Sequence, residues 1–569
     1  MTRIVRREVP DHAAWPPSIP NVLGRIFAAR GVLRPEDAEL KLARLLPPDT
    51  MGHLQAAVRI LADAITAHRH IVVVGDFDCD GATGTAVAVR GLRMLGASRV
   101  SYQVPHRITH GYGLSPALVE DLVSHAPDLL LTVDSGIACL AGIAAACARG
   151  WQVVVTDHHL PGPELPDANV IVNPNLAGDG FPSKALAGVG VVFYLMLALR
   201  RHLRDAGRLE AGEPDLSQLL DLVAVGTVAD LVALDPNNRL LVAAGLRRMR
   251  GGKCQPGLAA LADVAGRPLD KLVAEDIGFA IAPRLNAAGR LEDMAVGIEC
   301  LLTDDAVRAR ELALVLDRIN AERRGRQQSM LDEAEASLPA LAEGEPIPAA
   351  LVLFDQGWHP GVVGLVASKM KDRIHRPVLA FALAGQGSDQ LRGSARSIPG
   401  FHVRDALAAV DAAYPGMIER FGGHAMAAGL SLPREHLPAF REAFIKYALR
   451  VLDPRLLSAE LASDGPLAPS EINRTMAEAL RDAGPWGQGF AQPVFDNEFM
   501  VRDYRVLGER HLKLSLQHED GGAPISAIHF GGWIGEAPPA RLRAAYHLAL
   551  DDYRGREGVQ LLLVHWQPA

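Results

Sequence analysis

The chain has 569 residues, too many for a single hydrophobic core, so several domains are expected. Hydrophobic residues make up 49% and charged residues 22%, as in a globular protein, and no apolar run reaches the length of about 18 residues that a membrane helix needs. The net charge of -8 argues against a surface that wraps duplex nucleic acid, although it leaves room for a narrow basic channel.

The cysteines and the N-terminal sequence predict the compartment. The five cysteines are odd in number and form no CxxC pair, which favours reduced thiols. The first residues, "MTRIVRREVPDHAAWPP", lack the apolar middle region of a signal peptide. We therefore expect a cytoplasmic protein without a membrane anchor.

The first part of the chain predicts a helical lead-in followed by a parallel sheet. Residues 1–55 have helical spacing broken by glycine and proline, and residues 56–304 then alternate short apolar runs with helix-length segments. Continuous β-branched runs in such a series are typical of buried parallel strands. The predicted strands are "HIVVVGD" (70–76), "DLLLTVD" (128–134) and "WQVVVTD" (151–157).

The second half predicts a helix and two further domains. Residues 305–340 carry apolar residues at helical intervals, with one glycine in "RARELALVLDRINAERRGRQQSMLDEAEASL", and predict a long connecting helix. Residues 341–452 open with the strand "AALVLFD" and predict a smaller α/β domain. Residues 453–569 contain alternating runs, "HLKLSL", "YHLALDDY" and "VQLLLVHW", the last two joined by a turn containing Gly555 and Gly558. They predict a small antiparallel barrel.

Each of the three predicted strands of the first sheet ends in an acidic residue. In a parallel sheet the carboxyl ends of all strands lie along one edge, where ligands bind. Asp76, Asp134 and Asp157 are therefore expected to converge although they are far apart in the sequence.

More candidate ligands surround these acids. In "GDFDCDG" an extended backbone would point Asp76, Asp78 and Asp80 to one side, where three like charges would repel strongly unless a cation lay among them. The third strand is followed by two imidazoles, and a fourth apolar segment, "LDLVAVGTVADL", delivers another carboxylate; these residues are His158, His159 and Asp230.

This set of side chains predicts a metal centre. A lone DxD or an HH pair often has no function, but their joint placement at successive strand ends makes coincidence a poor explanation. Carboxylates mixed with imidazole favour manganese, iron or zinc over magnesium alone, and so many ligands favour two ions. Paired ions about 4 Å apart promote phosphoryl displacement, so hydrolysis of a phosphoester or phosphoanhydride is expected.

The same segments resemble a known superfamily. "GDFDCDG", "TVDSGI", "TDHH" and "GTVADL" are similar to the four motifs of the DHH phosphoesterases. Further segments resemble, in order, those of the RecJ family of bacterial single-strand-specific 5'-to-3' exonucleases: "VPHRITHGYGLS" (104–115), "LAGVGVVF" (186–193), "APRLNAAGRLED" (282–293), "WHPGVVGLVASKM" (358–370), "GSARSIPGFH" (393–402), "FGGHAMAAGL" (421–430) and "PWGQGFAQPVF" (485–495). The resemblance implies an α/β protein with a parallel-sheet DHH catalytic domain, a long helix, a DHHA1 domain and a C-terminal OB-fold barrel.

The resemblance also implies roles for individual residues. Two Mn²⁺ or Mg²⁺ ions are expected, with Asp134 placed to bridge them. At the position of Asp76, other members use a histidine a little upstream. The implied metal ligands are Asp76, Asp78, Asp80, Asp134, His158, His159 and Asp230. The residues implied in catalysis are Asp80, Asp157, which would orient an imidazole, and His159, which binds metal or contacts the scissile phosphate.

A second implied set binds the substrate strand. Arginine suits a grip on the terminal phosphate because its planar guanidinium binds phosphate bidentately. Glycine-rich "GGHAMAAG" would expose backbone N–H groups to phosphate or else pack tightly, and Tyr112 would stack on a base or else pack a turn. The implied substrate residues are Arg107, Tyr112, Arg284, Asn286, His359, Ser394, Arg396, Gly422, Gly423 and His424.

The expected function is exonucleolytic digestion of single-stranded DNA from the 5' end, releasing 5'-mononucleotides in DNA repair and recombination. The resemblance implies single-strand-binding protein and a RecQ-type helicase as partners, and a monomer is expected. Two alternatives stay open: a DHH phosphodiesterase acting on short oligonucleotides, whose members are generally shorter and lack the barrel, and a non-catalytic single-strand-binding scaffold, whose members lose metal ligands that this chain keeps.

Overall fold

The computed structural model describes residues 2–107, 109–210, 212–336, 348–385, 387–533, 535–551 and 558–569. The chain divides into two compact units, described separately below. One comprises Arg6–Ile319 and Ala462–Ala569, and the other comprises Met1–Val5 and Asn320–Leu461.

A five-stranded parallel sheet forms the centre of the first unit. The strand order is β3-β2-β4-β5-β6, and every neighbouring pair is parallel. The three strands expected from sequence are β2, β4 and β5, which lie side by side, so the predicted parallel sheet is confirmed. The strands are β2 (Ile71–Val74), β3 (Val100–Gln103), β4 (Leu129–Val133), β5 (Gln152–Thr156) and β6 (Val170–Val172).

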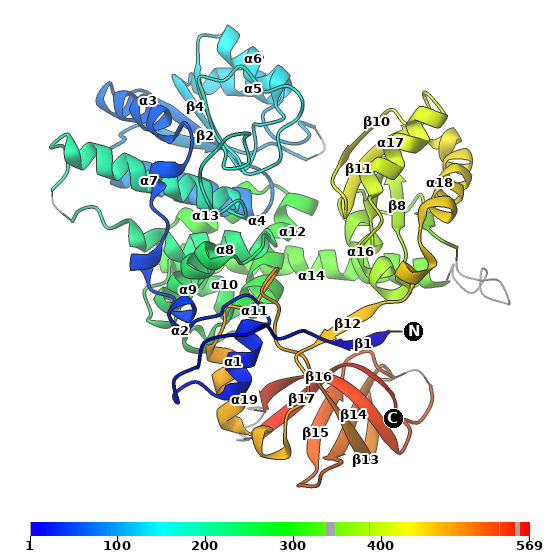
Figure 1. The fold of residues 1–569 in the computed structure, drawn as a ribbon. Coiled ribbons are helices and arrows are strands. Elements are labelled where there is room, and N and C mark those ends of the chain that lie inside the picture. The colour runs from blue at the N-terminus through cyan, green and yellow to red at the C-terminus, as the bar shows by residue number, and fades with distance from the viewer. Residues whose placement is uncertain are drawn as a thin grey trace. The chain divides into compact units, whose positions relative to one another are not determined.

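Helices cover both faces of this sheet, which explains why its central strands are apolar at every position. Val73 belongs to the core shared with α3 (Leu54–Thr66), α4 (Cys79–Met94) and α7 (Gly188–Asp205). Val72, which points the other way, packs in a separate core with α5 (Pro116–Leu122) and α6 (Leu140–Ala148). Figure 1 shows α5 and α6 together at one side of β2 and β4.

A group of helices follows the sheet in the same unit. The apolar segment that carries Asp230 is helix α8, not a strand. Helix α8 packs against α4 and α9, and its first eight residues are buried, consistent with a helix that is apolar all round. No helix within the described ranges is long and apolar enough to cross a membrane. The helices are α8 (Leu220–Ala229), α9 (Pro236–Arg250), α10 (Pro256–Val264), α11 (Ala274–Asp276), the π-helix η6 (Ile277–Ile281), α12 (Ala282–Leu291) and α13 (Ala295–Leu302).

The N-terminal region has the expected short helices, α1 (Asn21–Ala28) and α2 (Pro35–Ala38). It also contains a strand that the sequence pattern did not predict: β1 (Arg3–Arg6) forms a two-stranded sheet with β12 (Glu460–Ser463). The predicted long helix is present as α14 (Ala306–Ala336), and the predicted positions 337–340 lie outside the described residues.

The second unit contains a mixed five-stranded sheet in the order β10-β11-β9-β8-β7. Only β7 and β8 are parallel; the other neighbouring pairs are antiparallel. The predicted opening strand is β7. The elements are β7 (Leu351–Phe354), α16 (Val363–Ile374), β8 (Val378–Leu383), β9 (Gln390–Arg396), α17 (Val403–Ala413), β10 (Arg420–Gly423), β11 (Ala427–Pro433) and α18 (Leu437–Val451).

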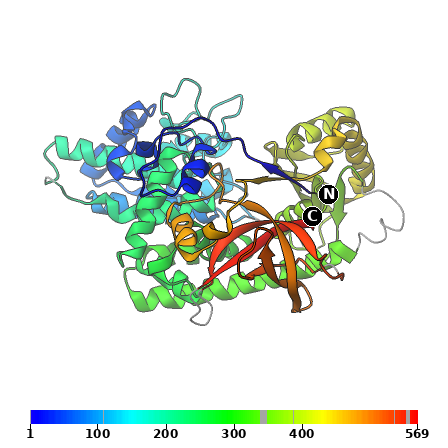
Figure 2. The same ribbon diagram turned by 60° about the horizontal axis from the view of Figure 1, so that its bottom comes forward.

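The C-terminal strands close into a barrel in the order β13-β14-β15-β17-β16, and Figure 2 shows it in red and orange. The prediction of a purely antiparallel barrel is wrong for one pair, because β15 and β17 are parallel. Gly558 begins β17, whereas the expected turn at Gly555 lies outside the described residues. The elements are α19 (Arg474–Asp482), β13 (Phe495–Leu507), β14 (His511–His518), β15 (Ile525–His529), β16 (Arg541–Asp551) and β17 (Gly558–Pro568).

Candidate metal centre

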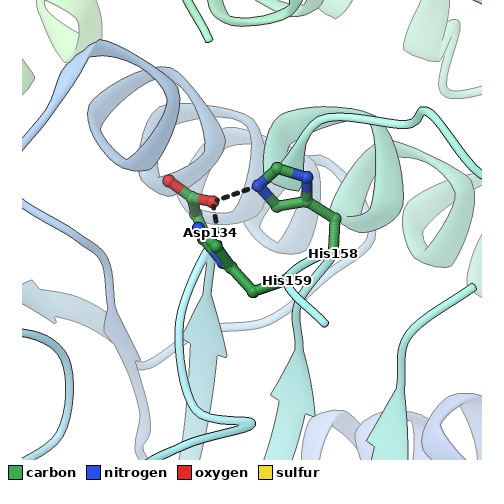
Figure 3. A group of neighbouring side chains, drawn as sticks. All are labelled: Asp134, His158 and His159. Carbon is green, nitrogen blue, oxygen red and sulfur yellow. Dashed lines mark ion pairs between the residues drawn. The ribbon is translucent and has the colours of Figure 1, made fainter. Parts of the chain in front are cut away.

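Asp134 lies directly after β4, and two imidazoles from the end of β5 point at its carboxylate (Figure 3). Its Oδ1 atom is 3.0 Å from His158 Nε2 and 4.0 Å from His159 Nδ1. The Asp134 backbone has a φ of 58°, in the left-handed region that few residues other than glycine adopt. Such strain is concentrated at functional sites, and here it accompanies a carboxylate that faces both histidines.

Asp157 has the role of an orienting residue in this geometry. Its Oδ1 accepts hydrogen bonds from the backbone N–H groups of His158 (2.7 Å) and His159 (3.0 Å) and contacts His159 Nδ1 at 2.7 Å. Its Oδ2 accepts from the Ile137 N–H at 2.9 Å. Both oxygens are therefore used inside the protein, and the carboxylate fixes the orientation of the His159 ring.

The "GDFDCDG" segment does not stay extended, so the alternation expected for its three carboxylates is wrong. Strand β2 ends at Val74, and Asp78 caps helix α4 by accepting a hydrogen bond from the Gly81 N–H at 3.0 Å. Asp80 therefore lies in the first helical turn. The backbone turns sharply between Asp76 and Gly81. A Cβ on Gly81 would lie only 2.5 Å from the Asp76 carbonyl oxygen, so the turn needs glycine at this position.

The start of helix α7 lies against this cluster. Asp80 Oδ2 accepts from the Gly188 N–H at 2.6 Å, and Oδ1 accepts from the Val189 N–H at 2.9 Å, where the helix dipole favours a negative charge. A Cβ on Gly188 would lie 2.5 Å from Asp134 Cβ, so only glycine permits this approach. Gly188 and Val189 were not predicted to belong to the site, although the glycines of "LAGVGVVF" could have indicated them.

Asp230 reaches the cluster from the C-terminal end of α8, where it is the capping residue. Its Oδ2 atom lies 3.5 Å from His158 Nε2. His158 thus has carboxylates of two separate segments beside one ring nitrogen, Asp134 from β4 and Asp230 from α8.

The structure brings all seven predicted ligands together. Their donor atoms form three groups, and within each group the atoms lie within 4.8 Å of one another. Asp134 belongs to two groups, and so does His158. The groups are Asp134, His158 and His159; Asp80, His158 and Asp230; and Asp76, Asp78 and Asp134.

Several of these donors have no hydrogen bond. Buried polar atoms in folded proteins nearly always have a hydrogen-bond partner, so exceptions call for an explanation. Four such exceptions among the described residues lie in this one cluster: Asp76 Oδ1, Asp134 Oδ1, His158 Nε2 and Asp230 Oδ2. Three carboxylate oxygens and one imidazole nitrogen, all buried and all facing one another, have the chemistry of a site for divalent cations.

The pKa values of the carboxylates are raised, as expected of a cluster of acids that binds cations. Burial, and then repulsion from neighbouring carboxylates, raises the pKa of Asp134 and of Asp230 well above the ordinary value. Burial and the charge of Asp78 do the same for Asp76, and they raise the pKa of Asp80 to about 7. Without cations these groups would hold protons that a metal must displace.

The two histidines differ in charge. Burial, followed by repulsion from His159, lowers the pKa of His158 to about 4, so its imidazole is neutral and able to bind a metal. Burial would also lower the pKa of His159, but the hydrogen bond and charge of Asp157 outweigh burial and raise it. The site therefore contains one neutral imidazole and one that favours a proton.

Two predicted substrate residues of the first unit lie beside the cluster. Tyr112 donates a hydrogen bond from its hydroxyl to the Asp134 carbonyl oxygen at 2.9 Å, and its ring meets the rings of Phe77 and His159 edge-on. Arg107 donates from Nε to the Gly289 carbonyl oxygen at 2.9 Å, and its guanidinium lies 3.8 Å from the centre of the Phe77 ring.

Helix α12 supplies two more of these residues. The side-chain oxygen of Asn286 accepts from the Cys79 N–H at 2.9 Å, so Asn286 supports the start of α4. Arg284 donates from Nη1 to the Ala280 carbonyl oxygen at 2.6 Å, and its Nη2 forms an ion pair with Asp317 at 2.7 Å. A phosphate bound by Arg284 would have to share it with this carboxylate.

In the second unit, Ser394 and Arg396 lie on β9 and contact each other. Arg396 Nη1 donates to Ser394 Oγ at 2.9 Å and to the Ala395 carbonyl oxygen at 2.8 Å, and burial lowers the pKa of the guanidinium. A Cβ on Gly364 would lie 2.9 Å from Ser394 Oγ and 3.1 Å from Arg396 Nη2. The start of α16 is thus packed closely over both side chains.

The glycine-rich segment forms the β10–β11 hairpin. Gly422 pairs with Gly429 across the two strands, and the His424 N–H donates to the Ala427 carbonyl oxygen at 2.7 Å. Gly423 has a φ of 138°, and a Cβ there would lie 2.4 Å from the same carbonyl oxygen. The turn itself therefore requires this glycine.

The remaining predicted substrate residue, His359, belongs to the same unit as the β10–β11 hairpin. Its Nδ1 accepts from the Gly361 N–H at 3.1 Å. Burial, followed by the charge of Arg326, lowers the pKa of its imidazole.

Three family models and two solved structures match this arrangement. Residues 70–227 match the DHH family, N-terminal domain, residues 348–449 match the DHHA1 domain, and residues 463–565 match the RecJ OB domain. The structure is similar to that of RecJ from Thermus thermophilus in complex with Mn²⁺, with a TM-score of 0.80, 32% identity and coverage of 98% of this chain and 79% of that chain. A second structure of the same Thermus protein, in complex with Mg²⁺, has a TM-score of 0.75 at 30% identity and covers 98% of this chain and 78% of that one.

Curated relatives extend the match along the whole chain. The single-stranded-DNA-specific exonuclease RecJ of Escherichia coli K12 is 47% identical over 565 residues, which cover 98% of each chain. The protein of the same name from Dickeya dadantii is 48% identical over 571 residues, with 99% of each chain covered. Identity of this extent shows that the chain belongs to the RecJ family.

Proposed function

We propose that this protein is a metal-dependent exonuclease that hydrolyses single-stranded DNA from its 5' end and releases 5'-mononucleotides. The observation that carries the proposal is the group of buried, unbonded donor atoms at the ends of β4, β5 and α8. The names of the relatives, single-stranded-DNA-specific exonucleases, supply the substrate.

The donor set fits Mn²⁺ or Mg²⁺, the ions found in the two Thermus structures. Asp134 and His158 are each shared between two groups of donors, and Asp134, whose carboxylate has two oxygens, would help to hold both ions. The other proposed ligands are Asp76, Asp78, Asp80, His158 and Asp230, whereas His159, whose protonated form is favoured, is assigned to the scissile phosphate. When bound, the ions supply charge stabilisation to the attacking and leaving oxygens of the phosphodiester.

The protein's own side chains would then position the reaction. Asp157 holds the His159 ring and favours its protonated form, so His159 offers a positive charge to a scissile phosphate beside the metal site. Tyr112 is anchored by its hydroxyl on the Asp134 backbone, and 41% of the residue is exposed, so part of its ring is open to a base.

Phosphate-binding residues would set the polarity of digestion. Ser394 and Arg396 in the second unit are proposed to grip the 5' phosphate. Arg107 and Arg284 in the first unit are proposed, separately, to bind phosphates of the strand. Five more residues are proposed substrate contacts: Asn286, His359, His424 and, through their backbone, Gly422 and Gly423. The OB-fold barrel would hold the strand through charge and stacking.

The cellular role is also a proposal. We propose that the enzyme works as a monomer in DNA repair and recombination, together with single-strand-binding protein and a RecQ-type helicase. A cytoplasmic location agrees with the five free cysteines, three of which are buried as thiols.

The test is digestion of end-labelled DNA by the purified protein with Mn²⁺. A 5'-phosphorylated single strand should disappear into mononucleotides while a blunt duplex of the same sequence persists. Rapid hydrolysis of dinucleotides with intact long strands would favour the short-oligonucleotide phosphodiesterase. Binding without any hydrolysis would favour the non-catalytic scaffold.

A further inference from the structure

Two apolar side chains on contacting segments, one of them directly after Asp230, are unusually open to solvent. Of the large hydrophobic residues in the described ranges, Phe279 is the most exposed at 81%, and Leu231 follows at 72%. Both belong to the first unit. Exposed apolar side chains that lie together at a functional site mark a surface that binds a partner or a substrate.

Leu231 is fixed by its position in the chain. It follows Asp230 directly, and its φ of 61° is left-handed, a conformation that costs free energy for a side chain of this size. Its N–H donates a weak hydrogen bond to the Val228 carbonyl oxygen at 3.4 Å. The strained backbone turns the leucine outward immediately beside a proposed metal ligand.

Phe279 lies on the π-helix η6, which packs against α8. A Cβ on the neighbouring Gly278 would lie 3.6 Å from Val228 Cγ1. Phe279 and Leu231 therefore extend from the two sides of one contact, that between η6 and the last turn of α8. Single π-helical turns occur mostly at functional sites.

A guanidinium suited to phosphate contacts the residue that follows Phe279. Arg284 Nη1 donates to the carbonyl oxygen of Ala280. The segment that carries Phe279 thus contacts both Arg284 and the last turn of α8, which precedes Asp230. Such surroundings suit a nucleotide, because its base is attached to a backbone of phosphates.

We propose that Phe279 and Leu231 form a platform that holds a base of the substrate strand beside the scissile phosphodiester. This inference rests on the proposed function. Stacking on an aromatic ring does not depend on the base, so the platform suits digestion of any sequence. It also requires a base freed from its partner, so the platform contributes to the preference for single strands over duplex.

The experiment measures KM and kcat of three variants on 5'-phosphorylated single strands with Mn²⁺. In Phe279→Ala the ring is lost, and we expect KM to rise about tenfold with kcat nearly unchanged, because one stacked base is lost. Phe279→Tyr should restore the wild-type KM. Leu231→Asn keeps a side chain that tolerates left-handed backbone but removes the apolar surface, and it should raise KM to a smaller extent.

Substrate variants show whether the lost contact is with a base. An oligonucleotide with abasic sites near its 5' end should raise the wild-type KM to that of Phe279→Ala, and the abasic sites should add little in the variant. Oligonucleotides that carry 2-aminopurine at successive positions can be bound to the metal-free protein. At one position, wild type should quench the fluorescence of this base and Phe279→Ala should not. The control is Val307→Ala, an equally open apolar residue (70% exposed) on α14, which should match wild type throughout.

The outcomes separate this inference from the proposed function. The platform would be overturned by an unchanged KM in Phe279→Ala. It would also be overturned if the abasic sites raised the KM of Phe279→Ala as much as they raise that of wild type. Either result would leave the nuclease assignment intact. A wild-type protein that leaves single strands undigested would instead refute the proposed function. Thermal unfolding of each variant identifies any loss that comes from misfolding, and Leu231→Asn together with the abasic substrate keeps the test decisive if Phe279→Ala is unstable.

Discussion

The His159 ring lies against a buried carboxylate: His159 Nδ1 is 2.7 Å from Asp157 Oδ1, and the other hydrogen bonds of Asp157 come from backbone N–H groups. Asp157 is fully buried, and its pKa is lowered because the hydrogen bond and charge of His159 outweigh burial, which alone would raise it. The pair thus stabilises a proton on His159 next to the metal centre.

Asp157→Asn is therefore expected to reduce kcat by about 10- to 100-fold while KM changes little, a usual effect of losing a residue that orients a ligand. The amide cannot favour the protonated imidazole, so the pKa of His159 should fall. Steady-state kinetics and an NMR titration of the histidine measure the two effects. Asp205→Asn, on an exposed part of α7, is the matched control, and an unaltered His159 titration would contradict the assigned role.

Asp80→Ala is expected to abolish hydrolysis and leave strand binding largely intact. Asp80 contributes a donor to the metal cluster, whereas affinity for the strand comes mainly from phosphate contacts elsewhere. Digestion in the presence of Mn²⁺ measures hydrolysis, and fluorescence anisotropy of a labelled oligonucleotide in EDTA measures strand binding. Full activity in this variant would show that the metal centre lies elsewhere.

The sheet and the convergence of its acidic ends were predictable because buried parallel strands are continuous apolar runs. Strand β3, "VSYQ", lacks that signal, since its residues are only half-buried. The segment before Asp230 is apolar at nearly every position, and periodicity alone cannot distinguish a buried strand from a buried helix there. The side chains of the seven candidate ligands lie together, as the strand ends indicated, but the turn at Gly81 and the start of α7 depend on tertiary contacts that no local pattern encodes.

Removal and return of metal should depend on pH. The pKa of Asp80 is raised from 3.8 to about 7 without metal, so the folded protein holds this proton more tightly than the unfolded chain. The stabilisation from that proton is complete below about pH 4 and is lost as pH rises to about 7. Mn²⁺ competes with the same proton, so the rise in Tm on adding Mn²⁺ should be larger at pH 8 than at pH 5.

Calorimetric titration with Mn²⁺ from pH 5 to pH 8 measures this competition. Below about pH 7, affinity should fall about tenfold per pH unit for each proton displaced. Asp80→Asn removes one of these protons, so its affinity should be lower but less dependent on pH. An affinity in the native protein that does not change with pH would contradict the assigned ligands.

Arg396 provides a test of the proposed 5'-phosphate grip. It is partly buried on β9, bonded to Ser394 Oγ and to a backbone carbonyl oxygen, and burial lowers the pKa of the guanidinium. A partly buried cation whose hydrogen bonds go to neutral oxygens is suited to an anion, and a phosphate would balance its charge. Arg396→Ala should therefore lose the preference for 5'-phosphorylated over 5'-hydroxyl strands, with kcat/KM on the phosphorylated strand about 10- to 100-fold lower.

The measurement compares kcat/KM on both strands for each variant. Arg396→Lys keeps the charge but not the planar fork, and it should recover only part of the preference. Arg404→Ala removes an exposed arginine on α17 and should behave like wild type on both strands. If Arg396→Ala slowed both strands equally, the residue would support the fold of its sheet rather than select the phosphorylated end.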